Sequence, residues 1–233
     1  MIRRFSVLIL LLALGIIFAN LFIGYTPDTE LNQTARYYAE HTASDIGATN
    51  IVTAIIVTYR GLDTLGEVTV LFLTAAIIGL VLSQGNKPSS SLQRQLPASG
   101  ELLTTGSRLL VPLILLLGAY VFVNGHLTPG GGFQGGAIIA SAALLLLLTD
   151  PLYRFSRRLI TIIESISGLF FIGLGILGIL LAGGFLDSRV LPTGELGSLF
   201  SAGLIPIIYS FVGLKVGAEF TSMLGNLAET EKS

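Results

Sequence analysis

Long apolar runs separated by short polar segments dominate the pattern of this sequence. Six of the runs have the length of about 17–25 residues that an α-helix needs to cross the hydrocarbon core of a bilayer. The six runs cover residues 5–25, 64–83, 107–123, 133–149, 159–181 and 199–223. The pattern therefore predicts an all-α integral membrane protein with about six transmembrane helices.

One further segment, residues 46–59, is apolar but short, and it follows the polar stretch 26–45. We expect it to form a short interfacial or re-entrant helix rather than a span. The serine- and proline-rich segment 84–101, QGNKPSSSLQRQLPASGE, is typical of a cytoplasmic linker. It divides the chain into a membrane module with two spans, 1–83, and one with four spans, 102–233.

The first apolar run follows the basic start MIRR. A secretory signal peptide has a shorter apolar core and a small-residue cleavage site, and no clean A-x-A follows this run. We expect an uncleaved anchor, with a cleaved signal as the alternative.

Composition supports a membrane protein, since 52% of the residues are hydrophobic and only 12% are charged. Soluble domains carry about 25% charged residues. The net charge of −1 gives no basis for binding nucleic acid. The absence of cysteine excludes disulfides, thiol catalysis and cysteine-ligated iron–sulfur clusters in this chain, and two histidines argue against haem or a histidine-rich metal site. We therefore expect no cofactor and no metal centre, and any linked redox chemistry belongs to a partner.

Basic residues predict the orientation, because cytoplasmic loops carry an excess of Lys and Arg. Six spans with a cytoplasmic N-terminus place nine basic residues inside and only three outside. The inside set is Arg3, Arg4, Lys87, Arg94, Arg108, Arg154, Arg157, Arg158 and Lys232, and the outside set is Arg36, Arg60 and Arg189. A seventh span at 46–59 would break this asymmetry, so both termini are predicted to be cytoplasmic.

The segment YRGLDTLGE, residues 59–67, carries the first candidate chemistry. A helix would place Arg60, Asp63 and Glu67 on one face. Charged groups at bilayer depth cost at least about 2.5–3.5 kcal/mol and by default indicate an ion or proton path. The alternative is structural: Thr64 and Glu67 fit a capping box, and Arg60 and Asp63 fit an ion pair at the membrane surface.

A glycine-rich segment, HLTPGGGFQGG, interrupts the chain between the third and fourth predicted spans. Non-helical backbone at membrane depth is tolerated only where protein buries it or where it lines a wet cavity. Its carbonyl groups would suit a cation, and His126 would suit a proton relay. The alternative is a tight hairpin in which His126 bonds to a carbonyl. The helix-break residues are Thr128, Pro129, Gly130, Gly131, Gly132 and Gln134.

Three more charged residues lie within predicted spans. Glu164 has apolar neighbours in the fifth span, and we expect it to face either a polar interior or partner subunit, or else lipid. Lys215 and Glu219, four residues apart in the sixth span, fit either an ion pair or two side chains that snorkel to the interface.

Two glycine motifs are better explained by helix packing than by ligand binding. GLGILG at 173–178 fits the dinucleotide fingerprint but lies inside a predicted span with no strand before it. The spacing of Gly213 and Gly217 is a packing motif. These small-residue faces predict extensive helix–helix contact.

Together, GHLTPGGGFQGGAIIASAALLLL and IPIIYSFVGLKVGAE resemble the MnhB/MrpB subunit of Mrp-type multisubunit Na+/H+ antiporters and the corresponding subunit of membrane-bound hydrogenase-type complexes. This resemblance covers about residues 102–224. The stretch NIVTAIIVTYRGLDTLGEVTVLFLTAA resembles the C-terminal end of MrpA, which is the separate MbhE-type subunit in the hydrogenase relatives. It covers about residues 47–82, so the chain resembles a fusion of two neighbouring modules.

The resemblance implies a non-catalytic transport subunit in a prokaryotic inner or plasma membrane. It implies antiporter-like and small membrane subunits as partners, and Na+ and H+ as the transported ions. Asp63 and Glu67 stand where the family pattern has its acids, whereas Thr58 stands where family sequences often have an acid.

Three functional hypotheses follow. In the first, Asp63 and Glu67 line a hydrated ion path, with Glu164 and His126 as secondary polar stations. In the second, the chain is a scaffold that docks antiporter-like subunits without contacting the ion. A stand-alone carrier is disfavoured because no inverted repeat is visible between the halves.

Overall fold

The computed structural model describes residues 2–25, 30–85, 100–150 and 152–230, and these residues form helices and loops without a strand. The contacts divide the chain into two compact units, Met1–Tyr37 and Tyr38–Ser233. The residues of the linker at 86–99 lie outside the described part of the chain. The division into modules 1–83 and 102–233 stays a prediction, and within the second unit α4 packs directly against α8.

The first unit contains α1 (Ile2–Ile23) and the start of α2 (Gln33–Ile46). From Phe5 to Ile23 helix α1 is almost entirely apolar around its circumference, which is the pattern of a helix surrounded by lipid or by partner subunits. Asn32 caps the start of α2 by accepting a hydrogen bond from the Ala35 amide at 2.8 Å.

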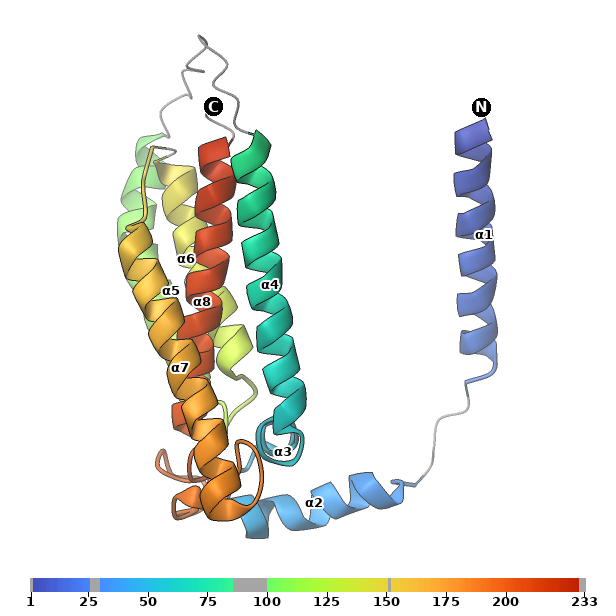
Figure 1. Cartoon of the computed structure of the whole chain (residues 1–233), viewed down its shortest axis with the longest axis vertical. Helices are drawn as coiled ribbons and strands as arrows, with labels where there is room; N and C mark the ends of the chain where they lie inside the picture. The colour runs from blue at the N-terminus through green and yellow to red at the C-terminus, as the bar shows by residue number, and fades with distance from the viewer. Residues whose placement is uncertain (1, 26–29, 86–99, 151, 231–233) are drawn as a thin grey trace. The chain divides into compact units, whose positions relative to one another are not determined.

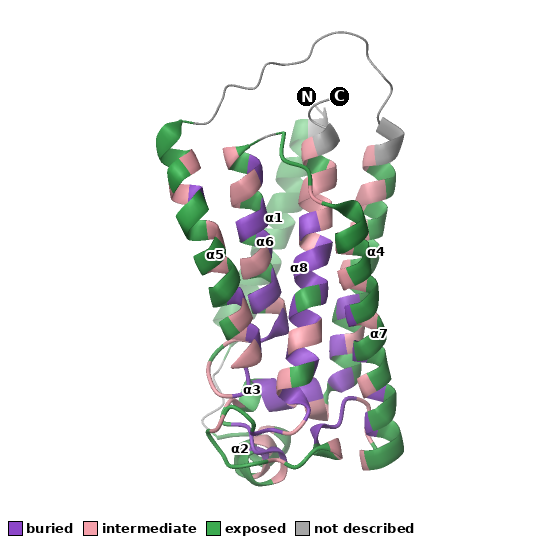
Figure 2. Ribbon diagram, turned by 90° about the vertical axis from the view of Figure 1, so that its left-hand side faces the viewer, coloured by how far each residue is buried: buried purple, intermediate pink, exposed green. Residues whose placement is uncertain are grey.

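The second unit is a bundle of five long helices placed side by side, with α8 packed against the other four (Figure 1). Burial is concentrated along α8, whereas α4, α5 and α7 keep largely exposed outer faces (Figure 2). The five helices are α4 (Gly61–Gly85), α5 (Glu101–Val123), α6 (Gly132–Thr149), α7 (Arg157–Ala182) and α8 (Ile205–Thr230).

Glycine permits the close packing of α6 against α8. A Cβ atom at Gly132 would lie 2.6 Å from the Val212 side chain, and one at Gly136 would lie 2.7 Å from the Val216 side chain. On α8, a Cβ at Gly213 would meet Phe122 of α5. Transmembrane helices lack a hydrophobic driving force for association, so close van der Waals contact of this kind stabilises the bundle.

The apolar outer faces of the helices identify them as membrane spans. Together with α1, the described residues contain six helices that are long and apolar enough to cross a membrane, as the sequence predicted. This confirms the all-α membrane fold with six spans. Residues 46–59 do not add a span: they contain α3 (Ile51–Ala54) and the π-helix η1 (Ile55–Tyr59), and Ala54 and Val57 are fully buried.

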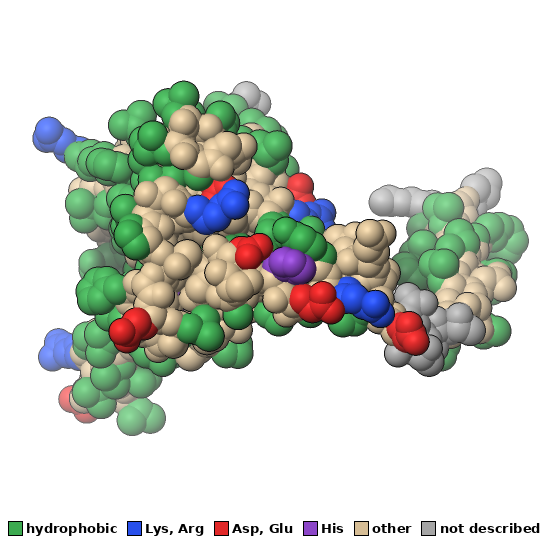
Figure 3. Space-filling model, turned by 90° about the horizontal axis from the view of Figure 1, so that it is seen from below, with side chains coloured by type: hydrophobic (Ala, Val, Ile, Leu, Met, Phe, Trp, Pro, Cys, Tyr) green, Lys and Arg blue, Asp and Glu red, His purple; other side chains and the backbone are tan. Residues whose placement is uncertain are grey.

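The two ends of the bundle differ in charge. Helices α4, α6 and α8 end, and α5 and α7 begin, at one end, which we call the basic end because Arg108, Arg154, Arg157 and Arg158 lie there. The opposite end, the loop end, comprises residues 46–60, 124–131 and 183–204. Viewed from below, the loop end shows acidic and basic side chains mixed with neutral ones (Figure 3).

Three local predictions need correction. Helix α4 begins at Gly61, so Thr64 lies within the helix and donates its hydroxyl to the Ile56 carbonyl at 2.5 Å instead of capping. Helix α8 begins at Ile205 and not at Leu199, because Ala202 and Gly203 have left-handed backbone angles that no α-helix accepts.

The third correction concerns the glycines at 173–178. Gly173 faces open space, and a Cβ at Gly178 would lie 2.6 Å from the Gly184 carbonyl oxygen in the following loop. Gly175 and Gly178 therefore leave room for the loop that follows α7, at Phe185 and Gly184, whereas the Gly213 and Gly217 pair packs against neighbouring helices as predicted.

Candidate functional site

The most buried acid among the described residues, Glu219, forms an ion pair with Lys215 on α8. Lys215 Nζ lies 2.7 Å from Glu219 Oε1, and the side chains of these residues are 10% and 0% exposed. The second carboxylate oxygen of Glu219, Oε2, is buried without a hydrogen-bond partner. Both residues lie towards the middle of a 26-residue helix, so the predicted ion pair forms and the snorkelling alternative is wrong.

Helices α4 and α7 contribute the surroundings of this pair. The Lys215 ammonium lies 5.1 Å from the ring centroid of Phe72 on α4, a cation–π contact, and its stem passes over Gly168 of α7. Glu164 is half-buried on α7 and interacts electrostatically with Glu219. One lysine is therefore placed among two carboxylates, which leaves this cluster with a formal charge of −1.

A groove of about 370 Å³ opens beside the cluster at membrane depth. Glu164, Ser165 and Lys215 line it together with Thr69 and Phe72 of α4. No hydrogen bond or ion pair holds the Glu164 carboxylate among the residues that the structure describes. A carboxylate in this position requires water, a cation or a partner subunit, because lipid would not solvate it.

The acids at the start of α4 lie nearer the loop end. Asp63 pairs with Arg60 at 2.5 Å, and both side chains are more than half exposed. Glu67 is exposed one turn further along and is close enough to Tyr209 of α8 to interact with it electrostatically. The predicted Arg60–Asp63 pair is therefore present, and Glu67 lies between it and the buried cluster along α4.

The glycine-rich segment is held by a short stretch of the N-terminal module. The Asn50 side-chain amide donates to the carbonyls of Gly125 and Thr128 at 2.8 and 3.0 Å, and Thr53 donates to the Gly125 carbonyl at 2.6 Å. Tyr209 of α8 donates its hydroxyl to Thr53. Protein groups thus satisfy the carbonyls of residues 125–128, which the sequence left open for a cation.

His126 is fully buried at the loop end, where its Nε2 lies 3.4 Å from the Ser198 carbonyl. Burial lowers the pKa of His126 below its usual value of 6.5, and nearby carbonyls including that of Ser198 offset only part of this effect. The ring is neutral at pH 7 and bonded to a carbonyl, as the hairpin alternative expected. Its role as a polar station remains a hypothesis.

A second buried charge lies at the loop end. Asp187 accepts three hydrogen bonds from the Arg189 guanidinium, at 2.9 and 3.2 Å from Nε and at 2.6 Å from Nη2. This pairing raises the pKa of Arg189. The same carboxylate also accepts from the Arg189 amide, so the pair fixes the turn after α7.

The structure thus brings together some predicted residues and separates others. Glu164, Lys215 and Glu219 form one cluster, Asp63 and Glu67 lie along α4, and His126 lies apart in the buried loop. Sequence reasoning missed Phe72, Asn50, Thr53 and Asp187. Only Asp187, an acid two residues before an arginine, carried a local signal. No group of three or more metal-binding side chains exists among the described residues.

Two family profiles match the sequence. Residues 102–222 match the domain related to the MnhB subunit of Na+/H+ antiporters, and residues 2–96 match MbhE, a subunit of MBH.

Curated relatives include an uncharacterized protein of Methanocaldococcus jannaschii, 31% identical over 192 residues that cover 72% of each chain. The A/B-type subunit of a probable K+/H+ antiporter of Rhizobium meliloti is 32% identical over 58% of this chain and 16% of that one. The B-type subunit of the Na+/H+ antiporter of Bacillus subtilis is 47% identical over 22% of this chain and 36% of that one. The chain therefore spans only a minor part of the antiporter relatives it matches.

Two solved complexes contain a similar chain. In the membrane-bound sulfane sulfur reductase, an archaeal respiratory membrane complex, the match covers 97% of this chain and 98% of that one with 37% identity and a TM-score of 0.81. In the Mrp complex from Dietzia, it covers 97% of this chain and 26% of that one with 25% identity and a TM-score of 0.77.

Proposed function

The chain belongs to the family related to the MnhB subunit of Na+/H+ antiporters, and we propose that it contributes to the ion translocation path of a multisubunit complex. The complex is a cation/proton antiporter or an antiporter-linked respiratory assembly, since relatives of both kinds match the chain. In this proposal the chain is a non-catalytic membrane subunit that works with antiporter-like and small membrane subunits.

The observation that carries the proposal is the buried Lys215–Glu219 pair beside Glu164. Burying an ion pair in place of apolar residues is often neutral or unfavourable for stability, so stability gives little reason for its presence. Ionisable residues within spans by default mark ion or proton paths. Two carboxylates that share one ammonium group can accept one further proton or one monovalent cation without a net excess of positive charge.

The exposed acids extend the path towards the loop end. Asp63 and Glu67 follow one another along α4, and the groove that Thr69 and Glu164 line begins on the same helix at Leu65, further towards the middle of the bundle. Carboxylate and hydroxyl oxygens suit Na+ as a hard cation. Because Glu67 and Glu164 are open at the side of this chain, the path is completed by a neighbouring subunit.

The decisive experiment measures Na+-dependent H+ exchange in vesicles that contain the whole complex. The double variant Lys215→Met/Glu219→Met removes both buried charges together and so avoids an unpaired charge. We expect it to assemble and to lose most exchange activity. Asp63→Asn, Glu67→Gln and Glu164→Gln should each lower the activity, whereas Glu195→Gln, which removes an exposed acid of the loop end, should not.

Assembly is checked in the same preparations by the recovery of the partner subunits. Normal exchange in an assembled double variant, together with normal exchange in Asp63→Asn and Glu67→Gln, would exclude this chain from the ion path.

One observation favours a scaffold as the second candidate. Asp63 is neutralised by Arg60 at the surface, and α4, α5 and α7 offer long apolar outer faces on which other subunits could dock. A scaffold predicts that the same substitutions reduce complex recovery while the remaining intact complex keeps its ion preference.

A further inference from the structure

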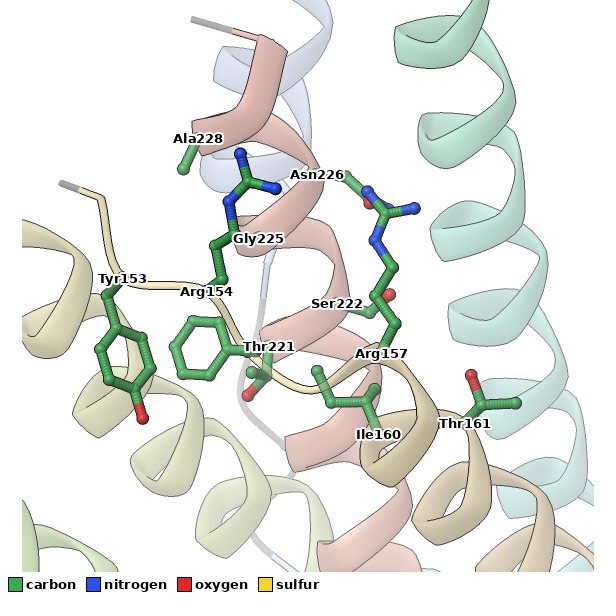
Figure 4. Close-up of a pocket in the computed structure, with 11 residues that line it drawn as sticks. Tyr153, Arg154, Arg157, Ile160, Thr161, Thr221, Ser222, Gly225, Asn226 and Ala228 are labelled. Atoms are coloured by element: carbon green, nitrogen blue, oxygen red, sulfur yellow. The ribbon is translucent and has the colours of Figure 1, made fainter. Parts of the chain in front are cut away.

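A polar cavity of about 200 Å³ lies at the basic end, away from the ion-path cluster. It is lined by the segment that joins α6 to α7, the first turns of α7 and the last turns of α8 (Figure 4). Arg154 precedes α7 and Arg157 is its first residue. Figure 4 shows both side chains extending along the end of α8, Arg154 near Gly225 and Arg157 near Asn226.

The lining of this cavity matches an anion. Beside the two guanidinium groups it contains the hydroxyls of Thr161 and Ser222 and the amide of Asn226, and no acidic side chain lines it among the described residues. Guanidinium groups bind phosphate through paired, charge-assisted hydrogen bonds, and hydroxyl and amide groups donate to the remaining oxygens.

An apolar groove of about 380 Å³ lies next to this cavity. Phe155, Ile160 and Thr221 line both spaces, so the two are adjacent. The groove runs between α7 on one side and α5 and α6 on the other, with α8 beneath, and apart from Thr221 its described lining is apolar. It therefore lies at hydrocarbon depth directly below a basic polar cavity.

We propose that this composite site binds one phospholipid, with the phosphate at Arg154 and Arg157 and one hydrocarbon chain in the groove between α7 and α5–α6. Basic pockets between transmembrane helices at the cytoplasmic side bind anionic head groups. The site has charged groups above and apolar surface below, and this arrangement matches the polar head group and hydrocarbon chains of a phospholipid.

The test uses the purified whole complex, delipidated and then titrated with phosphatidylglycerol, with bound lipid counted by native mass spectrometry. The double variant Arg154→Gln/Arg157→Gln should bind one lipid fewer per complex, or bind it at least tenfold more weakly. Arg108→Gln is the matched control, because Arg108 lies at the same end of the bundle and does not line the site. The variant Arg154→Lys/Arg157→Lys keeps the charge and should retain part of the binding.

Titrations with inorganic phosphate and with phosphatidylcholine distinguish the contribution of the basic cavity to binding from that of the apolar groove. A phospholipid site binds phosphatidylglycerol more tightly than inorganic phosphate, since phosphate cannot use the groove, and more tightly than zwitterionic phosphatidylcholine. Equal affinities for inorganic phosphate and phosphatidylglycerol would show that the site binds a free anion and not a lipid.

A measurement on the unaltered protein covers the case in which the glutamine variant does not assemble. Phosphatidylglycerol with a photoreactive group in its chain should crosslink to residues that line the groove, such as Ile139, Leu146 and Ile163. Equal lipid counts in wild type and variant, or crosslinking of the groove to another subunit instead of lipid, would overturn the proposal. None of these outcomes depends on whether the chain conducts ions.

Discussion

His126 shows how the fold changes the chemistry of a single residue. In the sequence it is a titratable ring in a glycine-rich loop, open to solvent or to an ion. In the structure it is fully buried, and its pKa is lowered because the charged form would lose its solvation. At the same scale, Lys215 and Glu219 lie buried inside the bundle within 2.7 Å of each other.

The lowered pKa of His126 predicts a pH-dependent loop. When the loop opens, the ring takes up a proton with its ordinary pKa of about 6.5. The stability of the closed loop is therefore complete above about pH 6.5 and is lost progressively as the pH falls through the lower folded pKa. Hydrogen exchange of residues 124–131, corrected for intrinsic rates, should rise at pH 5 relative to pH 8.

His126→Gln is the control, since glutamine does not titrate. Its loop should exchange with no additional pH dependence. The same pH dependence in this variant would show that another group is responsible.

At the scale of helices, the α6–α8 contact depends on residues without side chains. Gly132 and Gly136 of α6 face Val212 and Val216 of α8 at distances that leave no room for a methyl group. The sequence indicated a packing role for such glycines but not which helices would meet. That information came only from the fold, because a packing motif specifies a surface and not its partner.

Gly136→Ala should destabilise the bundle by about 1–3 kcal/mol through overpacking. The new Cβ atom would lie 2.7 Å from the Val216 side chain and 2.8 Å from the Gly213 carbonyl oxygen. The measurement is the thermal unfolding midpoint of this subunit in the purified complex.

Gly173→Ala is the matched control on α7, because nothing lies within 4 Å of the new Cβ atom. A loss of stability as large as that of Gly136→Ala would contradict the assignment of the effect to α6–α8 packing.

For the whole molecule, the distribution of basic residues between the two ends bears on orientation. Arg108, Arg154, Arg157 and Arg158 share the basic end, whereas Arg60 and Arg189 of the loop end each pair with an aspartate. The excess of Lys and Arg predicts a cytoplasmic basic end, and the proposed anionic lipid site lies at that end.

The absence of cysteine makes this orientation directly measurable. In cells that express the complex, Glu195→Cys at the loop end should react with a membrane-impermeant maleimide. Leu152→Cys at the basic end should react only after permeabilisation. Both positions are exposed in the chain, and the reverse labelling pattern would invert the topology.

The sequence by itself determined the spans, the family and the positions of the ionisable residues within the spans, since length, hydropathy and motif are local properties. It also predicted the Lys215–Glu219 and Arg60–Asp63 pairs, which follow from helical spacing.

Only the tertiary structure decided that Glu164 and Phe72 meet the Lys215–Glu219 pair, that Asn50 and Thr53 occupy the carbonyls of the glycine-rich loop, and that Arg154 and Arg157 lie above an apolar groove. Each of these contacts joins residues far apart in the chain. Their physical cause is the docking of separate helices on α8, which no local pattern encodes.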